Sequence, residues 1–244
     1  KMLKKIHNAD IIRWYSNIKG SVFLKGITVK ELFGENNTLA SELLNSVTYP
    51  FEALAKISDY IKRIGPTLDP DIYEQNGENI WIARSARVAA SASITGPCII
   101  GERTEVRHCA FIRGSALVGD DCVVGNSTEL KNVVLIGTVQ VPHYNYVGDS
   151  ILGYKAHMGA GSITSNVKSD KKLVVVKSPE GQIETGIKKF GAMLGDEVEV
   201  GCGTVLNPGS VVGSHSNIYP LSSVRGFVPA NSIYKKQGEV VEKY

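Results

Sequence analysis

The chain has 244 residues, a formal net charge of +3, and hydrophobic and charged fractions of 43% and 21%, as in an ordinary globular protein. The small net charge, with no clustered basic stretch, argues against a nucleic-acid-binding protein, and no apolar run is long enough to span a bilayer. The first residues, KMLKKIHNADIIRWYS, lack the unbroken apolar core of a signal peptide. We therefore predict a cytoplasmic protein that does not act at a membrane.

Residues 1–79 are predicted to form helices and loops. In ELFGENNTLASELLNS, Thr38 or Ser41 is expected as the N-cap of a leucine-bearing helix. The stronger pattern is TYPFEALAKISDYIKRIG, in which Pro50 suits the first helical turn and Gly65 followed by proline ends the helix. Its apolar residues recur at helical spacing: Phe51, Leu54, Ile57, Ile61 and Ile64. Such a face must pack on another element, and the second half of the chain is the expected partner.

A six-residue period begins near residue 80. Aliphatic residues hold every sixth position in two runs: Ile82, Val88, Ile94, Ile100, Val106, Ile112, Val118, Val124, Leu130 and Ile136, then Leu194, Val200, Leu206, Val212, Ile218 and Val224. This period fits neither an α-helix nor a simple strand. It fits a parallel β-helix with three hexapeptides per triangular coil, in which the aliphatic side chains fill the interior. We predict a mainly β protein with a β-helix over residues 80–228 and a C-terminal tail over 229–244.

The period is interrupted after Ile136. Pro142 stands where an aliphatic residue is expected, and Val147, Leu152 and Met158 resume the pattern in a shifted register. Residues 165–193 then form an insertion in which KKLVVVKSPEGQIETGIKK is typical of a β-hairpin turning at SPEG. The insertion either contributes to a functional site or caps the coil, and the place of projecting loops on rigid scaffolds favours the first interpretation.

Polar side chains gather at the interruption. The stretch VPHYNYVGDS contains His143, Tyr144, Asn145, Tyr146 and Asp149 within a few residues of one another. A neutral imidazole in such company can act as a general base near neutral pH. Either the Asp149 carboxylate or a backbone carbonyl would orient the ring, and the sequence leaves this choice open.

A metal site is not expected. His143 and His157 are 14 positions apart, and neither has a second histidine beside it, unlike the close pairs of zinc-dependent hexapeptide-repeat hydratases. No two cysteines form a C-x-x-C pair. Cys98 and Cys122 fall at small-residue positions of the repeat and are expected to be buried, reduced thiols.

Longer motifs carry a resemblance to a known family. They are GNSTELKNVVLIGTVQVPHYNYVGDSILG, GAGSITSNVKSDKK, KKFGAMLGDEVEVGCGTVLNPGS and VRGFVP, and together they cover most of residues 80–230. They resemble the C-terminal acetyltransferase half of bifunctional UDP-N-acetylglucosamine pyrophosphorylase/glucosamine-1-phosphate N-acetyltransferases, within the hexapeptide-repeat acyltransferase superfamily. The resemblance implies a left-handed β-helix, a homotrimer, acetyl-CoA as co-substrate, and direct acetyl transfer that requires no metal.

The resemblance also implies catalytic residues. His143 matches the general base that takes a proton from the acceptor amine. Asn166 matches an asparagine near that amine and the acyl carbonyl, and the backbone amide of Ala160 is the expected oxyanion donor. For acetyl-CoA the resemblance points to Cys202, where the family usually has serine, and to Lys235.

The remaining matches concern the acceptor. Arg113 and Lys131 correspond to the cationic pair that holds the sugar phosphate, and Tyr146 to a further ligand of that group. Lys172, or Lys171 if the loop aligns differently, corresponds to a lysine at the sugar site. His157 stands where the family usually has asparagine close to the acceptor sugar, so the identity of the acceptor is left open.

These matches predict an acetyl-CoA-dependent N- or O-acetyltransferase acting on a sugar phosphate that resembles glucosamine-1-phosphate. Residues 1–79 contain no glycine-rich phosphate-binding loop, so the nucleotidyltransferase half is expected to be absent. The alternative function is a catalytically silent scaffold or partner subunit whose helices dock a separate sugar nucleotidyltransferase. The retention of His143, Arg113, Lys131 and Asn166 favours the enzyme.

Overall fold

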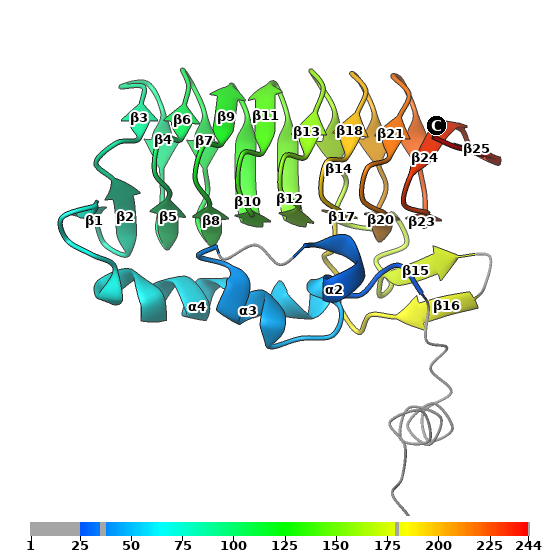
Figure 1. The fold of residues 1–244 in the computed structure, drawn as a ribbon, viewed down its shortest axis with the longest axis horizontal. Coiled ribbons are helices and arrows are strands. Elements are labelled where there is room, and N and C mark those ends of the chain that lie inside the picture. Colours follow the sequence, from blue (N-terminus) through cyan, green and yellow to red (C-terminus); the bar gives the residue numbers. More distant parts are fainter. Residues whose placement is uncertain (1–24, 35–37, 179–180, 244) are drawn as a thin grey trace, which may run out of the picture.

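The computed structural model describes residues 25–34, 38–178 and 181–243. Residues 1–24, the first part of the segment expected to be helical, lie outside this description. From β2 onward the strands of the coils pair with those one coil later, so three parallel ladders wind around one axis and form a β-helix (Figure 1). The prediction of a mainly β protein built as a parallel β-helix of hexapeptide repeats is confirmed.

The three ladders form three faces. Face A contains β2 (Ile80–Ala83), β5 (Cys98–Ile100), β8 (Ala116–Val118), the second halves of β10 (Glu129–Leu135) and β12 (Tyr146–Leu152), β17 (Ala192–Leu194), β20 (Ser210–Val212) and β23 (Phe227–Val228). Face B contains β4 (Ser93–Ile94), β7 (Phe111–Ile112), the first halves of β10 and β12, β14 (Ile163–Thr164), β19 (Val205–Leu206) and β22 (Ser223–Val224). Face C contains β3 (Arg87–Val88), β6 (Glu105–Val106), β9 (Val123–Asn126), β11 (Gln140–His143), β13 (His157–Met158), β18 (Glu199–Val200), β21 (Asn217–Ile218) and β24 (Ser232–Lys236).

The aliphatic period fills the interior of the β-helix, as predicted. Ile100, Val106, Ile112 and most of the other periodic residues belong to one buried cluster. Two predicted positions are wrong. Val88 lies in the first coil and remains 38% exposed. Ile136 faces outward into a second apolar cluster, and its neighbour Leu135 fills the interior instead.

The register shifts because two central coils have 17 residues, one fewer than the coil before them. Val118 pairs with Ile100, 18 residues earlier, whereas Leu135 pairs with Val118 and Leu152 with Leu135 after only 17. In these two coils β10 and β12 run unbroken through seven residues around the corner between faces B and A. The interruption seen in the sequence therefore begins between Leu130 and Leu135, before Pro142.

Helices cover the outer side of face A (Figure 1). They are α2 (Val29–Leu32), α3 (Ser41–Asn45), the 3-10 turn η1 (Pro50–Ala53), α4 (Ile57–Ile64) and the 3-10 turn η2 (Gly65–Thr67). Leu117, Val134 and Ile151 point outward from face A and are buried against Ile57 and Ile61 in the second cluster. The helical segment thus packs on the β-helix as expected.

The local helix predictions need three corrections. The segment expected as one helix is divided into η1 and α4. The N-cap of α3 is Ala40, because the Ser41 hydroxyl accepts a bond from the Thr38 N–H ahead of the helix. Residues 1–79 also include a strand, β1 (Tyr73–Gly77), which pairs antiparallel with β2. Within the described residues, no helix is long and apolar enough to cross a membrane.

The insertion extends this cover. β15 (Val175–Ser178) and β16 (Gly181–Glu184) pair antiparallel where the sequence predicts a hairpin, and residues 179–180 of its turn lie outside the description. Val174, Val176 and Ile183 are buried in the same outer cluster as the helices. At the end of the chain, β24 continues face C and pairs with β25 (Glu239–Glu242), so part of the expected tail belongs to the β-helix.

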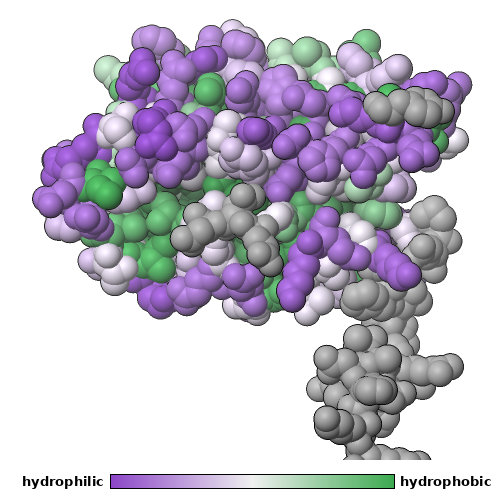
Figure 2. All heavy atoms as spheres, in the orientation of Figure 1, coloured by the Kyte–Doolittle hydropathy of each residue, from purple (hydrophilic) through white to green (hydrophobic). Residues whose placement is uncertain are grey.

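The surface reflects this arrangement. Hydrophilic side chains dominate the upper part of Figure 2, where face C lies, and hydrophobic side chains show mainly where the helical layer meets the β-helix. Face A is therefore covered by the helices and the insertion of the same chain. Faces B and C and the corner between them remain accessible to ligands.

Candidate active site

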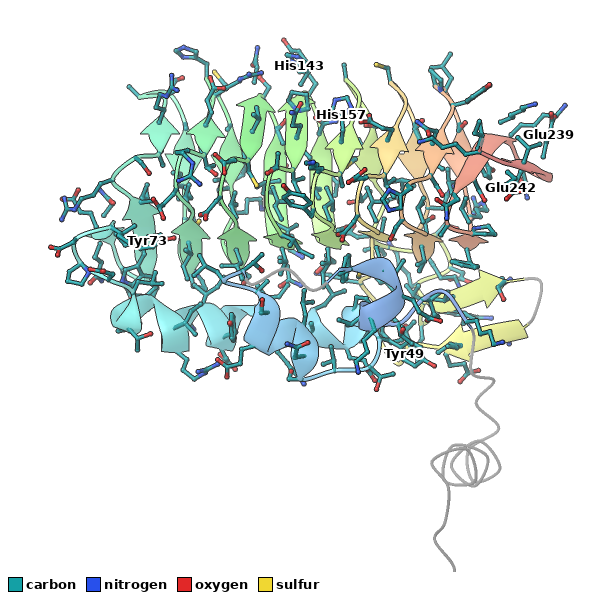
Figure 3. All side chains as sticks on the ribbon, in the orientation of Figure 1. Tyr49, Tyr73, His143, His157, Glu239 and Glu242 are labelled. Atoms are coloured by element: carbon teal, nitrogen blue, oxygen red, sulfur yellow. The ribbon has the colours of Figure 1, made fainter. Side chains whose placement is uncertain are left out.

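His143 lies at the corner between faces C and B, which we call the C–B corner. Its exposed side chain points away from the helical layer (Figure 3). The buried Asn145 fixes the backbone there, because its Oδ1 accepts a bond of 3.1 Å from the His143 N–H and its amide donates to the carbonyl of Gly159 at 2.9 Å. Within the described part of the chain the imidazole itself has no hydrogen-bond partner, so both ring nitrogens are available to a ligand.

The C–B corner stacks three of the predicted residues in successive coils. The Gly161 N–H donates to the carbonyl of His143 at 3.0 Å, and the Gly203 N–H donates to the carbonyl of Ala160 at 2.9 Å. His143, Ala160 and Cys202 therefore follow one another along the corner, and all three are exposed. The backbone N–H of Ala160 donates to no other described residue, as an oxyanion donor requires.

A second polar cluster occupies the opposite end of face B, at the B–A corner. At its centre the buried Asp149 carboxylate accepts bonds from Lys131 Nζ at 3.1 Å and Asn132 Nδ2 at 2.9 Å. It also accepts a short bond from Asn166 Nδ2, which in addition donates to Tyr146 Oη at 3.2 Å. We call these five residues the Asp149 cluster.

The shortened coils produce this cluster. Asn132 and Asp149 each turn the corner alone, with φ angles of 54° and 48°, where the coil before them uses Gly114 and Ser115, both with positive φ. Asn and Asp tolerate this left-handed conformation better than other side chains with a Cβ. Sequence reasoning did not assign Asn132 to the site. It left Asp149 or a backbone carbonyl as the group that orients His143, and the first alternative is wrong, because the Asp149 carboxylate lies at the other corner on Lys131 and Asn132.

Arg113 and Tyr146 complete the B–A corner. Arg113 Nη1 lies 2.6 Å from Glu129 Oε1, and Glu129 pairs with Tyr146 across the β10–β12 ladder. Burial, and then the nearby carboxylates of Asp149 and Glu129, raise the pKa of the Tyr146 phenol. The hydroxyl is therefore a proton donor throughout the neutral pH range. Because Glu129 and Asp149 neutralise Arg113 and Lys131, an incoming phosphate competes with two carboxylates.

Three predicted residues lie apart from these clusters. His157 is on face C, where its Nδ1 is 2.8 Å from Glu199 Oε2. Lys172 is exposed in the insertion, and its backbone N–H donates to Asp170 Oδ1 at 3.0 Å. Lys235, on β24, lies near the far end of the C–B corner with its Nζ 3.6 Å from Glu239.

Asp149→Asn is expected to lower the free energy of unfolding by about 2–3 kcal/mol, because the new amide places a donor among three donors and removes the partner of Lys131. The matched control is Asp121→Asn, at a corner with φ of 55°, where the carboxylate is 45% exposed and pairs with Arg103. We expect that change to cost less than about 1 kcal/mol. Urea unfolding measures both, and equal losses would show that the buried cluster is not what stabilises this corner.

Comparison with known proteins identifies relatives of the β-helix. The family described as GMPPB C-terminal domain matches residues 94–220, which is more than half of the chain and includes every site residue discussed above except Lys235. The bifunctional protein GlmU of Methanococcus aeolicus is 33% identical over 110 residues, covering 45% of this chain and 26% of that protein.

Two further relatives carry acetyltransferase names. The bifunctional sugar-1-phosphate nucleotidylyltransferase/acetyltransferase of Sulfurisphaera tokodaii is 33% identical over 104 residues, which are 43% of this chain and 26% of that protein. The uncharacterized acetyltransferase YaiX of Escherichia coli is 28% identical over 169 residues, covering 69% of this chain and 74% of the relative. The chain thus spans about a quarter of the length of the bifunctional relatives. The predicted resemblance to their acetyltransferase half is confirmed, and the chain belongs to the GMPPB C-terminal domain family.

Proposed function

We propose that this protein is an acyltransferase that moves the acetyl group of acetyl-CoA directly to an amino or hydroxyl group of a sugar phosphate. The observation that carries the proposal is the arrangement of face B. One end of the face presents the unpaired His143 imidazole, and the other presents the Asp149 cluster beside Arg113. A three-residue strand separates the two ends by roughly 10 Å, so one sugar phosphate can reach from the cluster to the imidazole.

His143 is the general base in this proposal. Its imidazole takes the proton from the acceptor amine or hydroxyl as the acceptor nitrogen or oxygen bonds to the acetyl carbonyl carbon. The Ala160 N–H donates to the oxygen that gains negative charge. The carbon–sulfur bond then breaks, and CoA leaves as a thiolate that is protonated in solution. Cys202 and Lys235 continue the C–B corner and would contact the CoA moiety.

The Asp149 cluster binds the acceptor. Arg113 is 45% exposed, so its guanidinium can leave Glu129 and form two parallel hydrogen bonds with a phosphate. Lys131, Tyr146 and Asn166 hold the sugar phosphate from the same side, and Lys172 reaches it from the insertion. The C–B corner is an exposed edge of one coil stack, so we expect a homotrimer in which a neighbouring copy closes the site.

The proposal is tested by measuring CoA release from acetyl-CoA. The acceptor panel is glucosamine-1-phosphate, galactosamine-1-phosphate and glucose-1-phosphate, which separates N- from O-acetylation. Saturable CoA release with one of them, with formation of the acetylated sugar phosphate, is the expected result. An enzyme that releases no CoA with any of the three contradicts the proposed function.

Arg113→Gln is expected to raise the KM of the best acceptor about 10-fold or more, because a charge-assisted bond to phosphate is lost. The KM of acetyl-CoA should not change. Arg107→Gln is the control, since Arg107 forms a comparable surface pair, 3.0 Å from Glu105, away from the Asp149 cluster. Steady-state kinetics with each substrate varied in turn give both constants. An unchanged acceptor KM would remove Arg113 from the phosphate site.

A further inference from the structure

Asn145 stands in a column of small residues along the C–B corner. Each coil places one such residue just before its face B strand, and hydrogen bonds between coils stack them in the order Ala92, Ala110, Thr128, Asn145, Ser162, Thr204 and Ser222. Alanine, serine or threonine is therefore sufficient to form this corner in the other described coils. Asn145 is only 2% exposed, so its amide contacts the protein and not a substrate. Its role lies in the bonds that the amide makes.

The Asn145 amide joins the coil of His143 to the next coil. Its Oδ1 accepts a bond from the His143 N–H at 3.1 Å, and its Nδ2 donates to the carbonyls of Gly159 at 2.9 Å and Ser162 at 3.1 Å. A serine or threonine hydroxyl is a single, shorter group and cannot replace the separate donor and acceptor of the amide. Asn145 therefore fixes the backbones of these two coils relative to each other.

The bond to Gly159 also determines where the Ala160 N–H points. The Gly159 carbonyl and the Ala160 N–H belong to one peptide group, which is planar and trans, so the two bonds point in opposite directions. The carbonyl is held toward the buried Asn145 amide. The N–H is consequently turned outward at the C–B corner, where Ala160 is exposed. One side chain thus holds both the backbone of the proposed base and the peptide of the proposed oxyanion donor.

We propose that Asn145 is a positioning residue for acyl transfer, which keeps His143 and the Ala160 N–H in one fixed arrangement. The inference rests on the proposed function. In that reaction His143 takes the proton from the acceptor while the Ala160 N–H stabilises the acetyl oxygen, so both groups must be aligned on the same reacting centre. A shift of the Gly159–Ala160 peptide relative to His143 would disturb this alignment without removing a contact to either substrate.

The test is steady-state kinetics of the full chain with acetyl-CoA and the panel acceptor of highest kcat/KM. Asn145→Thr, which gives this coil the residue of the coil before it, should lower kcat about 10-fold or more, because catalytic groups misplaced by a fraction of an ångström lose this much. The KM of each substrate should change less than about 2-fold. In a His143→Ala background the same change should lower kcat about 3-fold or less, because the base that Asn145 positions is absent. Asn145→Ser is the second variant should the first fail to fold, which circular dichroism measures.

Thr204→Ala is the matched control. Thr204 lies in the same column two coils later, is fully buried, and donates through Oγ1 to the carbonyl of Tyr219 at 3.2 Å, in the coil that leads away from Ala160. Its kcat should stay near the wild-type value, and an equal loss of kcat would overturn the specific role of Asn145.

The remaining outcomes separate this inference from the proposed function. If the wild type releases CoA and depends on His143, but the Asn145 variants leave kcat unaltered, the inference is overturned and the proposed function stands. The same holds if Asn145→Thr lowers kcat by an equal factor with and without His143, as a merely structural role would. If the wild type releases no CoA with any panel acceptor, both are overturned.

Discussion

His143→Ala is expected to lower kcat by about 10²-fold or more with the best sugar phosphate acceptor, because the variant has no group to take the proton as the acyl bond forms. The acceptor KM should change little, since the phosphate is proposed to bind the Asp149 cluster at the other end of face B. The fold should be preserved as well. The imidazole is exposed and has no partner among the described residues, so its removal leaves no buried polar atom unsatisfied.

His108→Ala is the control for this prediction. His108 lies at the same corner two coils earlier, where its carbonyl accepts a bond from Ser127 and its Nδ1 lies 3.1 Å from Ser91 Oγ. His108→Ala should leave kcat unchanged. A lower kcat in His143→Ala than in His108→Ala would then reflect loss of the base and not the general effect of removing a histidine from this corner. Turnover by His143→Ala equal to that of the wild type would exclude His143 as the base.

Much of the fold was predictable because the β-helix repeats its register in every coil. One aliphatic residue per hexad is enough to place the interior. The prediction failed at Ile136, because Val133–Ile136 is an unbroken aliphatic run in which two neighbouring registers are equally apolar. The length of the B–A corner determines whether Leu135 or Ile136 faces the interior. Asn132 spans the turn alone, and Leu135 therefore reaches the interior one position early.

The sequence also contains a signal for the helical cover that the six-residue period does not capture. Strands of face A are apolar at consecutive positions, as in Ala116–Val118 and Ala192–Leu194, because one side chain faces the interior and the next faces the helices. Strands of faces B and C instead carry polar or exposed residues outside, as at Glu105 and Glu199. A strand-by-strand count of the apolar residues at outward-facing positions would have identified face A as the face covered by the helices.

The candidate site was predictable only in part. The types and order of His143, Tyr146 and Asn166 are visible in the chain, but the contacts between coils are not. Asp149 meets Lys131 and Asn132 across one coil of 17 residues, a coil length that no local motif states. Glu199 meets His157 across the whole insertion, 42 positions away, so their pairing depends on where the insertion returns to the ladder.

Phe190→Ala is expected to lower the free energy of unfolding by about 3–5 kcal/mol, as is usual for a fully buried phenylalanine. Phe190 has no exposed surface, and its ring centroid lies 5.6 Å from that of Phe51 in η1. Phe190 lies near the end of the insertion and contacts three parts of the molecule: the segment after β14, the loop before β20 and the helical layer. Its N–H donates to the carbonyl of Asn166 at 3.0 Å, its carbonyl accepts from Gly209, and its ring fills the outer cluster under the helices. The cavity left in the variant would therefore lie between the helical cover and the segment after β14 that contains Asn166.

The total free energy of unfolding of a typical domain is about 5–15 kcal/mol. The loss expected for Phe190→Ala is a large part of that total. Urea unfolding monitored by circular dichroism measures it. Phe190→Leu keeps most of the volume and should lose clearly less than the alanine variant. Leu173→Ala, in the same insertion but 44% exposed, should cost less than about 1 kcal/mol. A loss in Phe190→Ala no larger than that in Leu173→Ala would show that the insertion and helices are not packed as one layer. The proposed acceptor site would then need another support for Asn166.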